Sequence, residues 1–147
     1  VKCNPSVKTS QDRDALREAL SNGTIDTIGS DHAPHLLSEK DAQYTKAPSG
    51  LPTIQQSLPV LLTIAHECEI PLTRIASVFS EKASELYSLN RGKILKGHEA
   101  HLVIFDNEKT FVVKAEDQKS KCGWTPYEGE TLRGEIKAVY LNGIKTI

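Results

Sequence analysis

Hydrophobic residues recur at helical spacing in three stretches of the first 90 residues. The first stretch predicts a helix over residues 12–20, with Thr9 or Ser10 as its N-cap and Asn22-Gly23 as its end. One apolar stripe along this helix consists of Ala15, Leu16, Ala19 and Leu20. Acidic residues occupy the first turn, where the helix dipole favours them.

Three further helices are expected after residue 52. A capping-box pattern at residues 53–56 predicts a helix to about residue 67, with a bend at Pro59. Pro71 suits the first position of the next helix. Ser80 can then cap a short third helix that ends near Tyr87.

Before the first helix and between the first and second helices, the pattern indicates extended chain and one long loop. Residues 1–5 are extended in character, and residues 25–30 are rich in β-forming residues, so we expect a strand there. A strand, a helix and a second strand within about 30 residues form a βαβ crossover and hence a parallel sheet. Residues 31–52 form a polar loop, and loops of this length are usually functional or disordered.

Beyond residue 90 the pattern changes to short strands. Residues 101–106 and 110–114 are expected to pair with each other, and residues 136–141 alternate in polarity. Asn142-Gly143 then predicts a type I′ hairpin into the last residues. The chain is therefore expected to divide into an α/β piece, residues 1–90, and a small β piece, residues 91–147.

Composition narrows the class of protein. The chain has 147 residues, with 18 Lys and Arg against 19 Asp and Glu, and this balance provides no electrostatic footprint for nucleic acid. No apolar run reaches the ~18 residues of a membrane span. Three widely spaced cysteines indicate reduced thiols and a cytoplasmic protein. Because there is no Met and the first residues resemble the interior of a fold, we expect a fragment.

The candidate chemistry lies directly after the strand expected at residues 25–30. Asp31 follows it, and catalytic groups collect at the carboxyl ends of strands in parallel α/β folds. A carboxylate there can bind a cation and accept a proton from metal-bound water. His35 can donate to a substrate anion. The residues alone leave open that Asp31 caps the loop and that the histidines lie on the surface.

Four segments of the chain resemble motifs of dihydroorotases, which belong to the amidohydrolase superfamily. The string Gly-Ser-Asp-His-Ala-Pro-His at residues 29–35 resembles their last-strand motif, and Asn4-Pro5 resembles the segment after their seventh barrel strand. Ala-Pro-Ser-Gly at residues 47–50 resembles the substrate loop. Residues 92–143 resemble the C-terminal β segment, so the resemblance covers essentially the whole chain.

The resemblance implies an α/β fold, namely the C-terminal part of a (β/α)8 TIM barrel plus the C-terminal part of a small β-sandwich domain. It implies a zinc-dependent, reversible hydrolysis of dihydroorotate to N-carbamoyl-aspartate in pyrimidine biosynthesis. Asp31 would be a metal ligand and the general base. His35 would bind the substrate carboxylate and Asn4 would hydrogen-bond the substrate, while the backbone at Ser49 and Gly50 would meet the ring edge.

The same resemblance implies that most ligands for one or two zinc ions lie outside this chain. A catalytic zinc needs three or more protein ligands, and the five histidines contain no His-x-His pair. His98 and His101 are expected on the surface, and His66 is expected on a helix surface or at an interface. Because a TIM barrel needs about 250 residues, about six strands would precede this chain, which should be inactive alone. The parent protein is expected to be a homo-oligomer with a small-molecule substrate.

Two other functions remain open. Another cyclic amidohydrolase, an allantoinase or a hydantoinase, would also use an Asp at a strand end, although the Ala-Pro-His sequence after His32 and the spacing of Asn4 favour dihydroorotase. The third possibility is a non-catalytic dihydroorotase-like protein. Trp124 and Tyr127 are expected to pack against the rest of the fold rather than to form a platform for an aromatic ligand.

Overall fold

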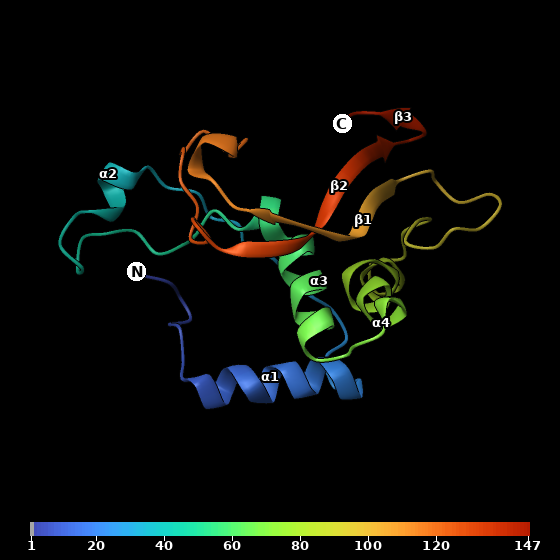
Figure 1. The fold of residues 1–147 in the computed structure, drawn as a ribbon, viewed down its shortest axis with the longest axis horizontal. Helices are drawn as coiled ribbons and strands as arrows, with labels where there is room; N and C mark the ends of the chain where they lie inside the picture. Colours follow the sequence, from blue (N-terminus) through green and yellow to red (C-terminus); the bar gives the residue numbers. More distant parts are fainter. Residues whose placement is uncertain (1) are drawn as a thin grey trace.

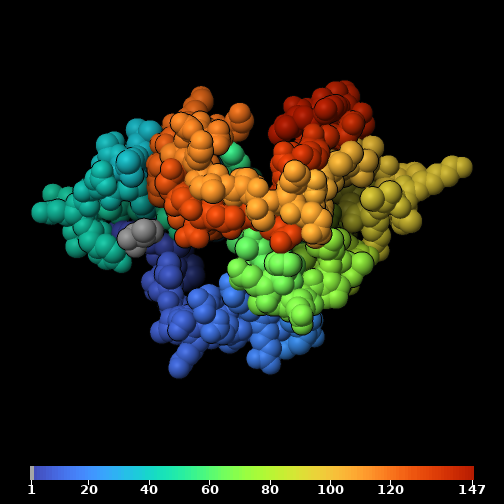
Figure 2. All heavy atoms as spheres, in the orientation of Figure 1, coloured from blue at the N-terminus to red at the C-terminus, as the bar shows by residue number. Residues whose placement is uncertain are grey.

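The computed structural model describes residues 2–147. Figure 1 shows helix α1 (Ser10–Asn22) lying across one end of the molecule, with helix α3 (Ser57–Glu67) extending from it to an antiparallel sheet. The space-filling view in Figure 2 shows the C-terminal residues, in orange and red, packed over the green helical residues. No helix among the described residues is long and apolar enough to cross a membrane.

Helix α1 has the ends that the sequence predicts. The Thr9 hydroxyl accepts from the Asp12 amide at 3.3 Å, and an Asp12 carboxylate oxygen accepts from the Thr9 amide at 3.0 Å. These two reciprocal bonds form a capping box. At the other end Gly23 has a φ of 93°, a left-handed conformation that a glycine adopts without a Cβ penalty. Local sequence therefore sets both ends of this helix.

The strand expected at residues 25–30 is not observed. A parallel strand needs hydrogen bonds from neighbouring strands, and in the described part of the chain residues 25–30 have none of that kind. The Ile28 amide instead donates to the Val78 carbonyl at 3.1 Å, and the Arg74 guanidinium donates to the Ile25 carbonyl. The segment is thus extended and held by helical residues, and no paired βαβ unit forms within residues 2–147.

The second helical region begins differently from the prediction. A 3-10 turn η1 (Ile54–Gln56) leads into α3, and the capping box expected at residues 53–56 does not form. The Thr53 hydroxyl donates to the Ser30 carbonyl at 2.6 Å and so ties this helix to an earlier segment. Pro59 lies in the first turn of α3, where the missing N–H of proline removes no helical hydrogen bond. The expected bend at Pro59 is therefore not needed, and the change from 3-10 to α-helical geometry occurs at Ser57.

The last helical region is continuous rather than divided. Pro71 is the N-cap and not the first helical residue, and Ser80 lies inside a π-helical turn and caps nothing. Three successive elements make up this region: α4 (Leu72–Ala76), the π turn η2 (Ser77–Glu81) and α5 (Lys82–Leu86).

The sheet has the order β1-β2-β3, formed by β1 (Leu102–Val112), β2 (Thr131–Leu141) and β3 (Ile144–Lys145). The two strands expected at residues 101–106 and 110–114 do not pair with each other, because both are parts of β1 and pair with β2. The hairpin between β2 and β3 is confirmed: Asn142 and Gly143 have φ values of 49° and 77°, the positive pair of a type I′ turn.

A buried apolar cluster joins the helices, and the sheet packs on it through α3. The cluster consists of Leu20, Leu61, Leu62, Ala65, Ile70, Ile75 and Val78. Gly134 of β2 lies against Leu62, and a Cβ at that glycine would approach the Leu62 side chain to 2.3 Å. The Arg133 amide also donates to the Thr63 hydroxyl at 2.9 Å. Side chains from both pieces of the chain therefore pack together here.

Candidate functional site

Three segments that are separate in sequence are joined by backbone hydrogen bonds, and they carry every predicted site residue. The Ala33 amide donates to the Leu51 carbonyl at 3.1 Å, and His32 and Leu51 form a parallel bridge. The Gly50 amide donates to the Lys2 carbonyl at 3.3 Å. Residues 2–4, 31–35 and 47–51 thus lie side by side.

Gly50 lies where two of these segments come closest. It is buried with a φ of 123°, and a Cβ there would lie 2.6 Å from the Ala33 Cβ and 2.7 Å from the Ala33 carbonyl oxygen. Both distances are far shorter than ordinary contacts, so only glycine allows this approach. Its backbone is also engaged, because its amide bonds Lys2 and its carbonyl accepts from the Lys40 ammonium at 2.9 Å.

Asp31 occupies an unusual backbone conformation at the start of the polar loop. Its φ is 45°, in the left-handed region that Asp tolerates better than most residues. The residue is exposed, and within residues 2–147 no hydrogen bond or ion pair engages its carboxylate. The carboxylate is therefore accessible to a ligand from outside the described residues.

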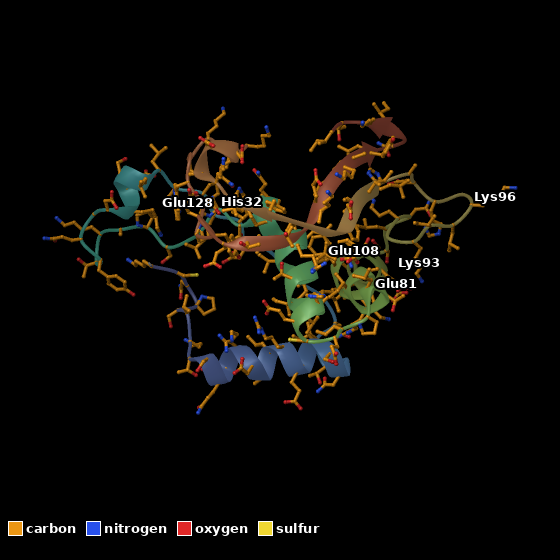
Figure 3. All side chains as sticks on the ribbon, viewed as in Figure 1. His32, Glu81, Lys93, Lys96, Glu108 and Glu128 are labelled. Atoms are coloured by element: carbon orange, nitrogen blue, oxygen red, sulfur yellow. The ribbon has the colours of Figure 1, made fainter. Side chains whose placement is uncertain are left out.

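His32 fixes the turn that presents Asp31, a role that the sequence did not reveal. Its Nδ1 accepts from the Thr53 amide at 3.1 Å and from the Ile54 amide at 3.3 Å. Because a protonated nitrogen cannot accept, Nδ1 holds the lone pair and the proton lies on Nε2. Figure 3 shows His32 near the start of α3. Nothing local in the sequence signals this role, since both donors lie more than 20 residues away.

His35 contacts both the short helix that follows it and the C-terminal piece. Its Nδ1 lies 3.9 Å from a carboxylate oxygen of Glu39, in helix α2 (Leu37–Lys40), so a protonated His35 forms an ion pair there. Its carbonyl accepts from the Trp124 indole at 2.7 Å. Trp124 is thus a second residue whose place beside the site the sequence did not indicate.

Asn4 follows Lys2 by two residues, and Ser49 directly precedes Gly50, so both lie close in sequence to the backbone bond between Lys2 and Gly50. Asn4 is exposed and Ser49 is half-buried. Residues 2–147 form no hydrogen bond with either side chain. Both side chains therefore retain polar atoms that a substrate could engage.

The described residues do not form a metal centre. They contain no group of three or more His, Cys, Asp and Glu side chains that could hold a metal ion. Asp31 offers one carboxylate, and one carboxylate does not hold a catalytic zinc. His66 instead contacts Arg133, with Nε2 3.3 Å from a guanidinium nitrogen, and His101 contacts Glu99 at 3.1 Å.

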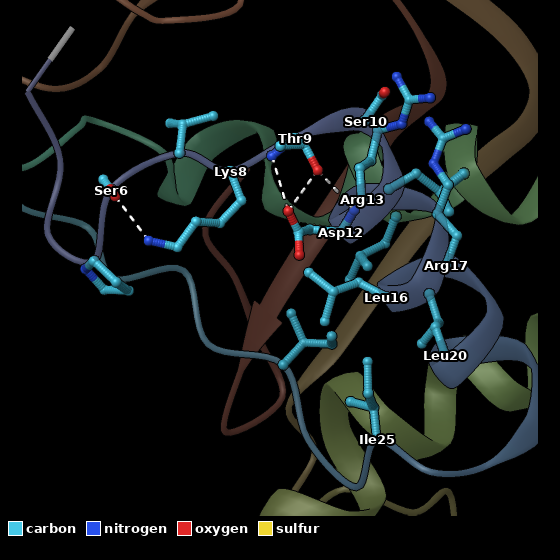
Figure 4. A pocket seen from close by; sticks show the side chains of 15 residues that line it. Ser6, Lys8, Thr9, Ser10, Asp12, Arg13, Leu16, Arg17, Leu20 and Ile25 are labelled. Atoms are coloured by element: carbon cyan, nitrogen blue, oxygen red, sulfur yellow. Dashed lines mark hydrogen bonds between the residues drawn. The ribbon is translucent and has the colours of Figure 1, made fainter.

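A further hollow lies away from these segments. It has a volume of about 820 Å³ and lies between the N-terminal segment, α1 and α3. Figure 4 shows the capping box of α1 and apolar side chains such as Leu16, Leu20 and Ile25 around it. None of the predicted site residues lines this hollow.

Comparison with known proteins gives a consistent result. The amidohydrolase family matches residues 3–145. The dihydroorotase of Halobacterium salinarum is 39% identical over 127 residues, which cover 86% of this chain and 30% of that protein. The dihydroorotase of Clostridioides difficile is 36% identical over 144 residues, covering 97% and 34%.

The solved structure of L-hydantoinase (dihydropyrimidinase) from Arthrobacter aurescens is similar with a TM-score of 0.91 and 29% identity. The similar region covers 98% of this chain and 33% of that one. The chain thus spans about a third of the length of the relatives that it matches.

Proposed function

Because the chain belongs to the amidohydrolase family, we propose that it forms the C-terminal part of a dihydroorotase. The longer protein would hydrolyse dihydroorotate reversibly to N-carbamoyl-aspartate in pyrimidine biosynthesis. Similarity to two dihydroorotases, over 86% and 97% of this chain, supports this choice of substrate. The observation that carries the proposal is the assembly of residues 2–4, 31–35 and 47–51 around an accessible Asp31 carboxylate.

In this proposal Asp31 is the general base. Hydrolysis of a ring amide requires a group that accepts a proton from the attacking water and returns it to the leaving nitrogen. The left-handed turn at Asp31 and the hydrogen bonds that His32 accepts from the Thr53 and Ile54 amides place the backbone of Asp31 at the surface of the three segments. A backbone position fixed in this way reduces the reorganisation that proton transfer requires.

Substrate binding falls to residues from all three segments. His35 would bind the substrate carboxylate, and its Nδ1 lies 3.9 Å from a carboxylate oxygen of Glu39. Asn4 would contribute a hydrogen bond, since residues 2–147 leave its side chain without a partner, and the backbone at Ser49 would meet the ring edge. Gly50 would shape the loop at the ring edge, because its own amide and carbonyl already have protein partners.

Zinc enters this proposal only through Asp31. Bound zinc supplies a water molecule of lowered pKa. The described residues do not hold such an ion by themselves. We propose one or two zinc ions whose other ligands belong to the rest of the longer protein, and we assign no step of this chain to them.

The domain organisation is part of the same proposal. Residues 1–90 would complete a (β/α)8 barrel, and residues 91–147 would complete a small β-sandwich domain. The extended, unpaired residues 25–30 and the exposed edge strand β1 support this proposal, because both are suited to pairing with further strands. The longer protein would be a cytoplasmic homo-oligomer that acts on a small molecule.

A second candidate is a hydantoinase-type enzyme, which the similarity to the solved L-hydantoinase favours. Turnover of dihydroorotate, hydantoin and allantoin by the full-length protein separates these activities. A non-catalytic dihydroorotase-like protein is the third candidate. A His-x-His pair in the preceding sequence would count against that third candidate, and its absence would favour it.

The role of Asp31 is tested by Asp31→Asn in the full-length protein, with Asp41→Asn as the matched control. Asp41 is exposed, and its side chain forms no hydrogen bond within residues 2–147. We expect Asp31→Asn to lower kcat by about 10²-fold to 10⁴-fold or more, because it removes the proton acceptor, and Asp41→Asn to retain full turnover. Near-normal turnover of Asp31→Asn would refute the role of Asp31.

A further inference from the structure

The Lys40 ammonium is surrounded by backbone carbonyls. Its Nζ donates to the carbonyls of Lys2 at 2.9 Å, Pro48 at 2.8 Å and Gly50 at 2.9 Å. The residue is half-buried, and no carboxylate among residues 2–147 forms an ion pair with it. An ammonium has three N–H donors, and here each has an acceptor.

The three acceptors belong to two of the segments that carry site residues. Lys2 is two residues before Asn4, while Pro48 and Gly50 lie on either side of Ser49. The direct bond between these segments, from the Gly50 amide to the Lys2 carbonyl, is long at 3.3 Å. Hydrogen bonds from a charged donor are stronger than those between neutral groups, so the Lys40 bonds dominate the connection between the two segments.

Lys40 is also attached to the third segment. It is the last residue of α2, a helix of four residues that begins two residues after His35. Glu39 fixes the start of this helix, because its carboxylate accepts from the Leu36 amide at 2.7 Å. The same carboxylate lies 3.9 Å from the His35 ring. Lys40 therefore connects all three segments of the candidate site.

The hydrogen bonds of Lys40 show whether its ammonium can bind the substrate directly or can only position the protein backbone. An ammonium that bound the substrate carboxylate would keep a donor free for it, whereas all three donors of Lys40 are directed at the protein backbone. The geometry points to Lys40 as a positioning residue that sets the separation of residues 2–4 and 48–50, and with it the places of Asn4 and Ser49 against the substrate. The kinetic consequence rests on the proposed function, but the structural one does not.

The test compares Lys40→Met, Lys40→Arg and the control Lys46→Met in the full-length protein. Lys46 is exposed on the same loop, and its side chain has no hydrogen bond within residues 2–147. Without substrate, we expect amide hydrogen exchange in residues 47–51 to accelerate about tenfold to a hundredfold in Lys40→Met, because charge-assisted bonds are lost. Exchange in α3 and in the Lys46→Met variant should match the wild type.

With dihydroorotate, Lys40→Met should raise KM about tenfold or more and change kcat less than about threefold, because it removes binding shared by substrate and transition state. Lys40→Arg should recover part of both effects, since it keeps the charge but its planar fork cannot reproduce three convergent bonds. A kcat loss at constant KM would contradict a positioning role in substrate binding.

If the amides of residues 47–51 exchange at the wild-type rate in Lys40→Met, the inference is overturned. If Lys40→Met does not fold, Lys40→Arg decides: faster exchange at residues 47–51 supports the connection, and wild-type exchange overturns it. If the wild-type protein does not turn over dihydroorotate, the proposed function fails, while the exchange result still decides the role of Lys40.

Discussion

Replacing Gly50 with Ala is expected to disrupt the contact between the two loop segments of the candidate site. The added Cβ would lie 2.6 Å from the Ala33 Cβ and 2.7 Å from the Ala33 carbonyl oxygen, and the φ of 123° is one that side chains rarely adopt. The backbone conformation costs about 1–3 kcal/mol. The steric overlap adds about 1–3 kcal/mol, because the nearest atoms include backbone that cannot turn away.

The matched control is Gly23→Ala. Gly23 also has a positive φ, 93°, but a Cβ there would meet nothing within 4 Å. This variant should lose only the conformational contribution, about 1–2 kcal/mol. Urea denaturation of the full-length protein should therefore show a larger loss of unfolding free energy for Gly50→Ala, by about 1–3 kcal/mol, the steric contribution.

Turnover provides a second measurement of the same contact. Because residues 47–51 face the proposed substrate position, Gly50→Ala should also lower kcat/KM by about a hundredfold, the effect of a displacement near 1 Å. Gly23→Ala, at the end of α1, should leave kcat/KM nearly unchanged. Equal losses of stability in the two variants would show that Ala33 and Gly50 do not make this close contact.

Four further changes test other parts of the structure. His35→Ala should raise KM for dihydroorotate with a smaller effect on kcat; an unchanged KM in steady-state kinetics would count against carboxylate binding. Thr9→Ala should cost about 1 kcal/mol in urea denaturation, because it removes the N-cap of α1. Hydrogen bonds from Thr9 lower the pKa of Asp12 in the folded protein. The Asp12 carboxylate therefore stabilises the fold above its unfolded pKa near 4, and this stabilisation is lost as the pH falls through the lower folded pKa. Asp12→Asn should therefore reduce the difference in unfolding free energy between pH 7 and pH 3. Trp124→Phe should remove the donor to the His35 carbonyl and raise amide exchange at residues 35–37, and exchange at the wild-type rate would show that this bond holds nothing in place.

Features governed by local sequence were predicted well. The Thr9 cap depends on Asp12, three residues later, and the end of α1 depends on the conformation of Gly23 itself. The type I′ turn at Asn142-Gly143 depends on two residues that accept a positive φ. Each of these signals lies within about four residues of the structure that it determines.

Features that depend on distant partners were not predicted correctly. The expected strand at residues 25–30 has β-forming residues but no neighbouring strand among residues 2–147. The two halves of β1 alternate in polarity as the strands of a hairpin do, yet their partner is β2, whose paired residues lie 19 or more positions further along the chain. Alternation identifies an extended segment and does not identify its partner.

The candidate site shows the same division. Asp31 and His35 stand out because their motif is compact, and the structure brings their segment beside residues 47–51. His32, Lys40 and Trp124 were not assigned roles from the sequence. Their hydrogen-bond partners lie up to 89 residues away, so no local pattern marks them.

The central claim is that the longer protein uses Asp31 to open the dihydroorotate ring. The most direct test is the loss of dihydroorotate followed with the full-length, zinc-loaded protein, for the wild type and for Asp31→Asn. We expect the wild type to turn over dihydroorotate faster than hydantoin and allantoin, and we expect Asp31→Asn to lose about 10²-fold or more of this activity. Preferential turnover of allantoin or hydantoin, or an active Asp31→Asn variant, would contradict the central claim.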